Sequence, residues 1–226
     1  MRYLLFGILL AIAFPALGKD SLRISFIPVF QGDTIAPGKS IPYMNHPLVF
    51  DVFRFYISNI RFQQKGKVTY REKNSFHLMD FSSKETMQLS IPVSEKNLQS
   101  DSILIHLGID SATNVSGALG GDLDPTKGMY WAWQSGYINM KVEGRSGLIS
   151  QKDSTFQYHL GGYAAPFSTL QSLRFVFPKN KKLNIVIDLF PFLEKLRLSG
   201  ASNIMSPGKN AVQLSAFVST LFAQQP

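Results

Sequence analysis

The stretch Leu48–Phe62 (LVFDVFRFYISNIRF) constrains the fold most, because its odd and even positions separate fairly well into different side chains. Phe53 and Phe55 fall on one side of the backbone, and Arg54 and Tyr56 fall on the other. A repeat of two residues is the period of a β-strand, whereas a helix repeats every ~3.6 residues. The sequence therefore predicts a long strand here, with one face turned toward a core.

Similar short segments, rich in aromatic and β-branched residues and separated by turn residues, recur along most of the chain. Many short strands at regular spacing are typical of an antiparallel β-sandwich or a partly open barrel. The sequence thus predicts an all-β fold, with the Pro-rich segment Ile41–Pro47 as a loop inside the domain. The other predicted strands are Leu22–Phe30, Val68–Tyr70, Phe76–Phe81, Met87–Ile91, Ser102–Ile109, Met129–Val142, Ser154–Gly161, Ser172–Phe177 and Leu183–Asp188.

Two segments near the C-terminus have a helical pattern instead. Leu189–Leu198 and Asn210–Ala223 repeat apolar residues at spacings of about 3–4, as an amphipathic helix does. Asn210 is the expected N-cap of the second helix. We expect a short C-terminal helix that closes one end of the β domain.

The N-terminus has the pattern of a secretory signal peptide over residues 1–18. Arg2 precedes the apolar run Tyr3–Phe14, which is too short to span a membrane, and Ala16 and Gly18 suit a cleavage site. No later apolar run reaches membrane-spanning length. We expect a single mature domain over residues 19–226, secreted to the periplasm or the cell surface.

Composition and motifs exclude several function classes. The chain has no cysteine, which removes thiolate metal sites and cysteine nucleophiles. Its net charge is +8, but the basic residues are scattered, so a nucleic-acid partner is not expected. Because the sequence lacks G-x-S-x-G, H-E-x-x-H and phosphate-loop motifs, a hydrolase has little support. The protein is therefore not expected to be an enzyme.

Four histidines are the candidate metal ligands. None pairs with another at helical or strand spacing, so a site must be assembled from distant segments. His159 is the most suggestive, because it precedes Gly161 and Gly162, which allow a close approach by a ligand or a second backbone. His106 shares the His-Leu-Gly context. For His106, His46 and His77, a local structural role is the favoured interpretation. For His159, the alternative is a half-buried strand histidine bonded to a carbonyl.

The densest aromatic stretch is Gly121–Gly144, which holds both tryptophans of the chain, Trp131 and Trp133. It follows a Gly-rich, acidic loop, and such loop-to-strand junctions often carry binding residues. A packed aromatic core is the other interpretation. In the loop, Asp122 and Asp124 offer carboxylates for calcium, or alternatively accept hydrogen bonds within a turn.

This stretch carries a family resemblance. Met129–Tyr137, with its Met-x-Trp-x-Trp-x-Ser-Gly-Tyr order, and the later His159–Gly161 resemble the signatures of the MbnP family. These are secreted copper-binding proteins associated with methanobactin operons and paired with MauG-like di-haem partners. Further pieces match in the expected order along most of the mature chain: Phe55–Asn59, Leu107–Asp110, Asn114, Gly121–Pro125 and Glu143–Gly144.

The resemblance implies a copper-binding protein in which a di-haem partner oxidises one tryptophan to kynurenine. Carried over, it points to His159 and either Trp131 or Trp133, with His106 as a possible second ligand; Met129 and Met140 offer thioether contacts or core packing. Members of the methanobactin branch often carry cysteines, which this chain lacks. A non-enzymatic surface module that binds a sugar or a protein through exposed aromatics is the alternative.

Overall fold

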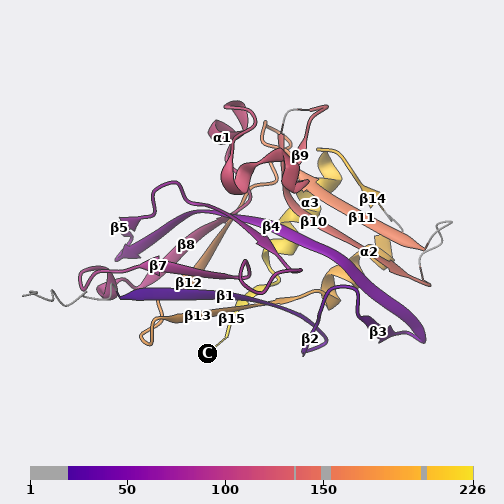
Figure 1. The fold of residues 1–226 in the computed structure, drawn as a ribbon, viewed down its shortest axis with the longest axis horizontal. Helices are drawn as coiled ribbons and strands as arrows, with labels where there is room; N and C mark the ends of the chain where they lie inside the picture. The colour runs from indigo at the N-terminus through magenta and orange to yellow at the C-terminus, as the bar shows by residue number, and fades with distance from the viewer. Residues whose placement is uncertain (1–19, 135, 149–153, 200–202, 226) are drawn as a thin grey trace, which may run out of the picture.

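The computed structural model describes residues 20–134, 136–148, 154–199 and 203–225. The expected signal peptide, residues 1–18, lies outside them. Two sheets make up most of the described chain, and the larger curls into a half-barrel over the smaller (Figure 1). The all-β prediction is confirmed.

The smaller sheet has five strands in the order β15-β13-β1-β2, with β7 also paired to β1. Leu22, Ile24 and Phe26 of β1 alternate inward, as the sequence predicts. Its strands are β1 (Ser21–Phe30), β2 (Asp33–Thr34), β7 (Gln88–Pro92), β13 (Lys182–Asp188) and β15 (Phe222–Gln224).

The larger sheet has ten strands arranged around β4 (His46–Gln64), the long strand expected from the alternating stretch. Strands β10 and β8 pair along one edge of β4, and β3, β6 and β5 pair along the other. The remaining strands are β3 (Ser40–Tyr43), β5 (Lys67–Arg71), β6 (Phe76–Asp80), β8 (Ser102–Leu107), β9 (Tyr130–Trp131), β10 (Gly136–Ser146), β11 (Thr155–Gly161), β12 (Gln171–Val176) and β14 (Asn203–Ile204).

Two pairings are parallel, β1 with β13 and β11 with β14, whereas the sequence predicts antiparallel sheets. Alternation of apolar residues determines which face of a strand is buried, but not the direction of its neighbour. The segment Met129–Val142, predicted as one strand, is in fact the hairpin of β9 and β10.

The prediction of a loop over Ile41–Pro47 is wrong, because a tight hairpin joins β3 to β4 there. Met44 and Asn45 form its two-residue turn, and both have positive φ, 48° and 63°. Such turns match the twist of paired strands. The usual sequence signal, Asn-Gly, is missing, so the hairpin was not apparent from the residues.

The helices are short. The α-helices are α1 (Ser111–Val115), α2 (Phe190–Ser199) and α3 (Lys209–Ser219), and the 3₁₀ turns are η1 (Asn97–Gln99), η2 (Gly121–Leu123) and η3 (Pro125–Lys127). Helix α3 confirms the C-terminal helix, but its N-cap is Gly208, not Asn210, and strand β15 follows it. No described helix is long and apolar enough to cross a membrane.

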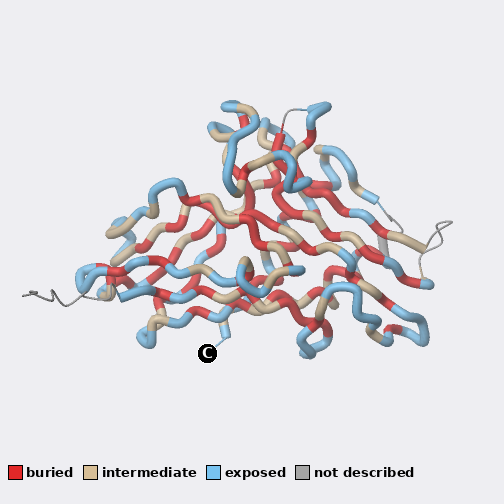
Figure 2. The backbone as a smooth tube through the Cα atoms, in the orientation of Figure 1, coloured by how far each residue is buried: buried red, intermediate tan, exposed pale blue. Residues whose placement is uncertain are grey.

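The main core lies between the sheets, where Phe and Ile side chains of β1, β4, β8 and β13 meet. Figure 2 shows buried backbone along the inner strands and exposed loops at the ends. Leu193 of α2 and Leu214 of α3 also enter this core. The opposite, outer face of the large sheet is therefore the face that could carry a functional site.

Candidate functional site

A cap, residues 108–134, lies across the outer face of the large sheet and includes α1, η2, η3 and β9 (Figure 1). The buried side chain of Asn114 ties it down. Its amide donates to the carbonyls of Ile109 at 3.1 Å and Asp110 at 2.9 Å, and its Oδ1 accepts from the backbone N–H of Tyr137 at 2.8 Å. This side chain joins the start of the cap to the start of β10.

Under the cap is a small apolar cluster, separate from the main core. Trp131 belongs to it and is only 6% exposed, whereas Trp133 in the following turn is 66% exposed. The two rings are 5.7 Å apart between centroids and tilted by 46°. The cluster comprises Tyr56, Leu78, Ile109, Leu123, Met129, Trp131, Tyr137 and Ile138. One tryptophan is thus buried core and the other a surface group in contact with it.

Trp131 packs on Gly161, the last residue of β11. A Cβ at Gly161 would lie 2.5 Å from Cζ3 of Trp131, closer than any real contact. His159 lies two residues earlier on the same strand and so faces the same side of the sheet. The Trp-containing run and the His-Leu-Gly segment, distant in sequence, are brought together by the pairing of β9, β10 and β11.

His159 is buried, at 6% exposure, and its Nε2 lies 2.6 Å from Oε1 of Glu143. Burial lowers the pKa of the imidazole, although the bond to Glu143 opposes this, so the ring is neutral at pH 7. A carboxylate oxygen can only accept, so Nε2 carries the proton and Nδ1 keeps a lone pair. A buried neutral imidazole of this kind is competent to bind a metal.

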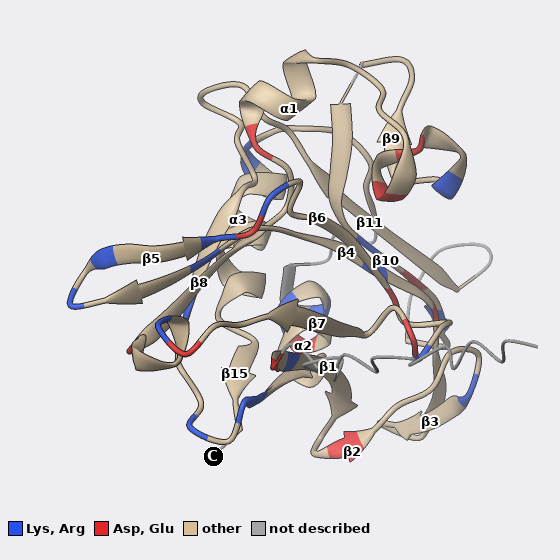
Figure 3. Cartoon of the chain, turned by 60° about the vertical axis from the view of Figure 1, so that its left-hand side comes forward, with Lys and Arg blue, Asp and Glu red and all other residues tan. Residues whose placement is uncertain are grey.

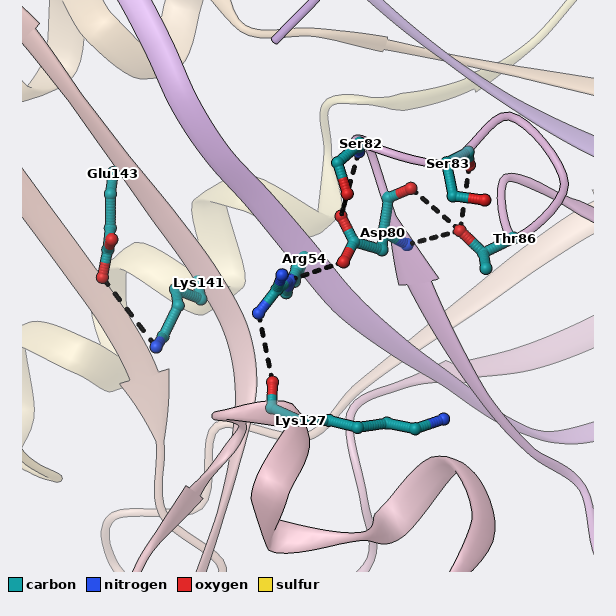
Figure 4. Close-up of polar contacts among 8 residues, drawn as sticks. All are labelled: Arg54, Asp80, Ser82, Ser83, Thr86, Lys127, Lys141 and Glu143. Atoms are coloured by element: carbon teal, nitrogen blue, oxygen red, sulfur yellow. Dashed lines mark hydrogen bonds and ion pairs between the residues drawn. The ribbon is translucent and has the colours of Figure 1, made fainter. Parts of the chain in front are cut away.

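His159 ends a row of ionisable residues that crosses the outer face. Cross-strand register places His159 opposite Lys141, Lys141 opposite Arg54, and Arg54 opposite Asp80. Arg54 Nε bonds Asp80 at 2.7 Å, and its Nη1 donates to the carbonyl of Lys127 in η3 at 3.1 Å (Figure 4). The row therefore also fixes the cap to the sheet.

Lys141 is the least well paired member of this row. Its Nζ lies 3.9 Å from Oε1 of Glu143, the oxygen that His159 already uses (Figure 4). Burial lowers the pKa of Lys141, Glu143 opposes that shift, and nearby Arg54 adds to it. Glu143 therefore faces an imidazole and an ammonium on the same surface.

His106 lies elsewhere on the large sheet, in β8. Its Nε2 accepts from Arg61 at 3.0 Å, and its Nδ1 lies 3.3 Å from the amide of Asn59. Burial and then the Arg61 charge lower its pKa. His106 thus has different polar neighbours from His159, and its Nε2 lone pair is already occupied by a cationic donor.

Among the described residues, no three His, Cys, Asp or Glu side chains are grouped closely enough to hold a metal ion. His159 and Glu143 are a two-residue donor set. Met140 belongs to the main core on the other face of the sheet, and Met129 to the cluster under the cap. A metal at His159 would need a further ligand of another kind.

A family model, MbnP, matches residues 19–206. The chain belongs to the MbnP family. The solved structure of MbnP from Methylosinus trichosporium has a similar fold, with a TM-score of 0.57 and 16% identity over 77% of this chain and 78% of that one. None of the curated proteins matches the sequence.

In this MbnP-family chain, the two loop aspartates accept hydrogen bonds. Asp122 accepts from the backbone N–H of Leu78 at 3.1 Å and from Lys127 Nζ at 2.6 Å. Asp124 accepts from the backbone and the hydroxyl of Thr126 at 2.8 and 2.7 Å. The Asp124 contacts are those of the turn interpretation, whereas Asp122 bonds the distant strand β6 and a lysine of η3.

Three neighbours of His159 in this candidate site were not singled out as site candidates from the sequence: Glu143, Lys141 and Arg54. In the sequence, Glu143 was noted only as the end of the Trp-containing segment that matches the family. Their proximity to His159 depends on strand register across β4, β10 and β11. The alternation of β10, with Met140 and Val142 inward, was the one signal that placed Lys141 and Glu143 outward together.

Proposed function

We propose that this protein is a secreted copper-binding protein, periplasmic or at the cell surface, and that it is not itself an enzyme. One of its tryptophans is the substrate of a MauG-like di-haem partner, which oxidises it to kynurenine. Membership of the MbnP family supports the general assignment. The observation that carries the site is the buried neutral His159 on the strand against which Trp131 packs.

His159 supplies the primary ligand in this proposal, through Nδ1, while Glu143 holds the ring and fixes its tautomer. Carboxylates that bond the second nitrogen of a ligating histidine commonly have this role. Copper, when bound, supplies a soft cation that imidazole can hold in either oxidation state. The cap excludes water from this face by burying Trp131 and its apolar neighbours.

Kynurenine would provide the missing donor. Its formation breaks the C2–C3 double bond of the indole, a four-electron oxidation that uses two equivalents of hydrogen peroxide. Each equivalent supplies one oxygen atom, to C2 or to C3, and is reduced to water. Hydrolysis then releases C2 as formate and leaves an aryl amine beside a ketone, so a donor-only ring becomes a potential ligand. Trp131 is the better placed for ligation because it packs on β11, and exposed Trp133 is the better placed to meet a partner.

Copper titration of the purified protein tests the site. His159→Ala is expected to weaken copper binding by at least ~10-fold, because it removes the one buried neutral imidazole beside Trp131. His46→Ala is the matched control, since His46 is an exposed residue of the β3–β4 hairpin. Equal affinities for wild type and His159→Ala would refute this assignment.

Mass spectrometry of protein from the native host, grown with the partner present, tests the modification. The peptide with Trp131 and Trp133 is expected to gain one oxygen and lose one carbon, as conversion to kynurenine requires. Trp131→Phe and Trp133→Phe, expressed in the same host, identify which ring is altered. Two intact tryptophans in the wild-type peptide would count against the partner reaction. The copper titration tests the metal site independently of that result.

A further inference from the structure

A surface cavity of about 190 Å³ opens beside Trp131, at the end of the molecule that carries the cap. Half of its lining residues have ring side chains: Trp131, Tyr163, Pro166, Phe167 and Pro207. Phe167 is 44% exposed, so an apolar ring faces solvent at this site. The cavity joins the turn after β9, the loop after β11 and the segment before α3.

Small residues create the room for it. A Cβ at Gly136 would lie 3.1 Å from Cε1 of Tyr163, and one at Gly162 would lie 2.3 Å from the carbonyl oxygen of Phe167. Gly162 also has a φ of +127°, which L side chains rarely adopt. Ala164 and Ala165 complete this part of the wall. A larger side chain at either glycine would displace the rings.

No charged residue of the described chain lines the cavity. The segments around it, residues 111–121, 128–140, 160–173 and 203–208, contain no Asp, Glu, Lys or Arg, although the chain has 38 such residues, 23 basic and 15 acidic. Figure 3 shows few charged residues at this end, around α1: those of η2 and η3, an acidic segment just before α1 and a basic segment beside it. A charged ligand entering here would lose its hydration with no partner to replace it.

We propose that this cavity binds an uncharged ligand built on a single aromatic ring. Its volume is close to that of an engineered cavity of about 150 Å³ that binds benzene, so it holds one ring with small substituents and not a larger ligand. Stacked and edge-on contacts with Trp131, Tyr163 and Phe167 supply the attraction. Gln134 and the Tyr163 hydroxyl offer hydrogen bonds at a polar substituent.

The few polar side chains that line the cavity disfavour a sugar as its ligand. A monosaccharide presents several hydroxyls, each of which needs a partner when it leaves water. Apart from the Trp131 indole N–H, the lining side chains with polar atoms are Gln134 and Tyr163. The proposed ligand site does not depend on copper, because its lining residues include neither His159 nor Glu143. It uses the intact indole of Trp131, so it is tested on protein whose tryptophans are unmodified.

Titration with p-cresol, a neutral single ring, tests the proposal by calorimetry on the full mature chain. Wild type is expected to bind p-cresol with a dissociation constant of about 1 mM or tighter, typical of a small ligand in a partly open apolar site. Benzoate, of similar size but charged, is expected to bind at least ~10-fold more weakly. Ala164→Phe is expected to fill the cavity and weaken p-cresol binding by at least ~10-fold.

The matched control is Ala216→Phe, the same substitution at an exposed position of α3 outside the cavity. It is expected to keep the wild-type affinity within about twofold. No p-cresol binding by wild type, equal affinities for p-cresol and benzoate, or unchanged affinity in a folded Ala164→Phe would each overturn the proposal. The p-cresol and benzoate comparison uses wild type alone, so it holds even if Ala164→Phe fails to fold.

Discussion

At Gly161 the fold accepts no side chain, because the indole of Trp131 and the carbonyl oxygen of Tyr137 both occupy the space of a Cβ. The clash distances would be 2.5 and 2.8 Å. Gly161→Ala is therefore expected to lower the free energy of unfolding by about 2–3 kcal/mol, as overpacking of a rigid site does. Urea unfolding followed by tryptophan fluorescence measures it.

Gly120→Ala in the cap is the control for this substitution. Its φ of −94° suits any residue, and no heavy atom lies within 4 Å of the position that a Cβ would take. It is expected to change the free energy of unfolding by less than about 0.5 kcal/mol. Equal effects of the two substitutions would show that the Trp131 contact does not constrain Gly161.

Single residues also show which parts of the candidate site could be predicted from the sequence. The order of the motifs pointed to His159 and to either Trp131 or Trp133, and the structure brings the segments of His159 and Trp131 together through the pairing of β9 and β11 with β10. Glu143 and Lys141 could not be connected to His159 in advance, because a shift of register by one residue would turn them to the other face. His106 matched the same local motif, yet its neighbours come from β4, at Asn59 and Arg61.

At the level of whole elements, alternation predicted the strands better than their connections. Strand β4 is longer than the apolar stretch that predicted it, because pairing with β3 extends its start and pairing with β5 extends its end. The short helix α1 was missed, since a single turn that depends on the Asp110 cap and on Asn114 has no periodic signal. Where a strand or a short helix ends thus depends on residues distant in sequence, so the local pattern of apolar residues cannot predict it.

At the scale of the molecule, the described residues form two apolar clusters on opposite faces of one sheet, a main core and a small cluster under the cap. A strand buried on both faces is apolar on each side, as Phe55 and Tyr56 of β4 illustrate. The sequence could therefore predict a β domain, but not that residues 108–134 fold back over its outer face. That fold-back is what places Trp131 beside the His159 strand.

Within the large sheet, Asp80 of β6 holds Arg54 of β4, whose guanidinium also donates to the cap at the Lys127 carbonyl. The ion pair between Asp80 and Arg54 has a predictable pH dependence. Partial burial disfavours the ionised form of Asp80, but hydrogen bonds from Ser82 and the Arg54 guanidinium outweigh it and hold the pKa of Asp80 below its usual range. A carboxyl whose pKa is lower in the folded state contributes stability above its unfolded pKa. That contribution is lost as the pH falls through the folded value.

Asp80→Asn is therefore expected to lower the free energy of unfolding by about 1–2 kcal/mol at pH 7, since it removes a charge-assisted bond that is largely shielded from solvent. The difference from wild type should shrink toward zero as the pH falls below the folded pKa of Asp80. Asp51→Asn is the control, because its bond to Arg145 is exposed and contributes little. Urea unfolding over a series of pH values measures both, and a pH-independent loss in Asp80→Asn would show that the charge of Asp80 does not stabilise its bond to Arg54.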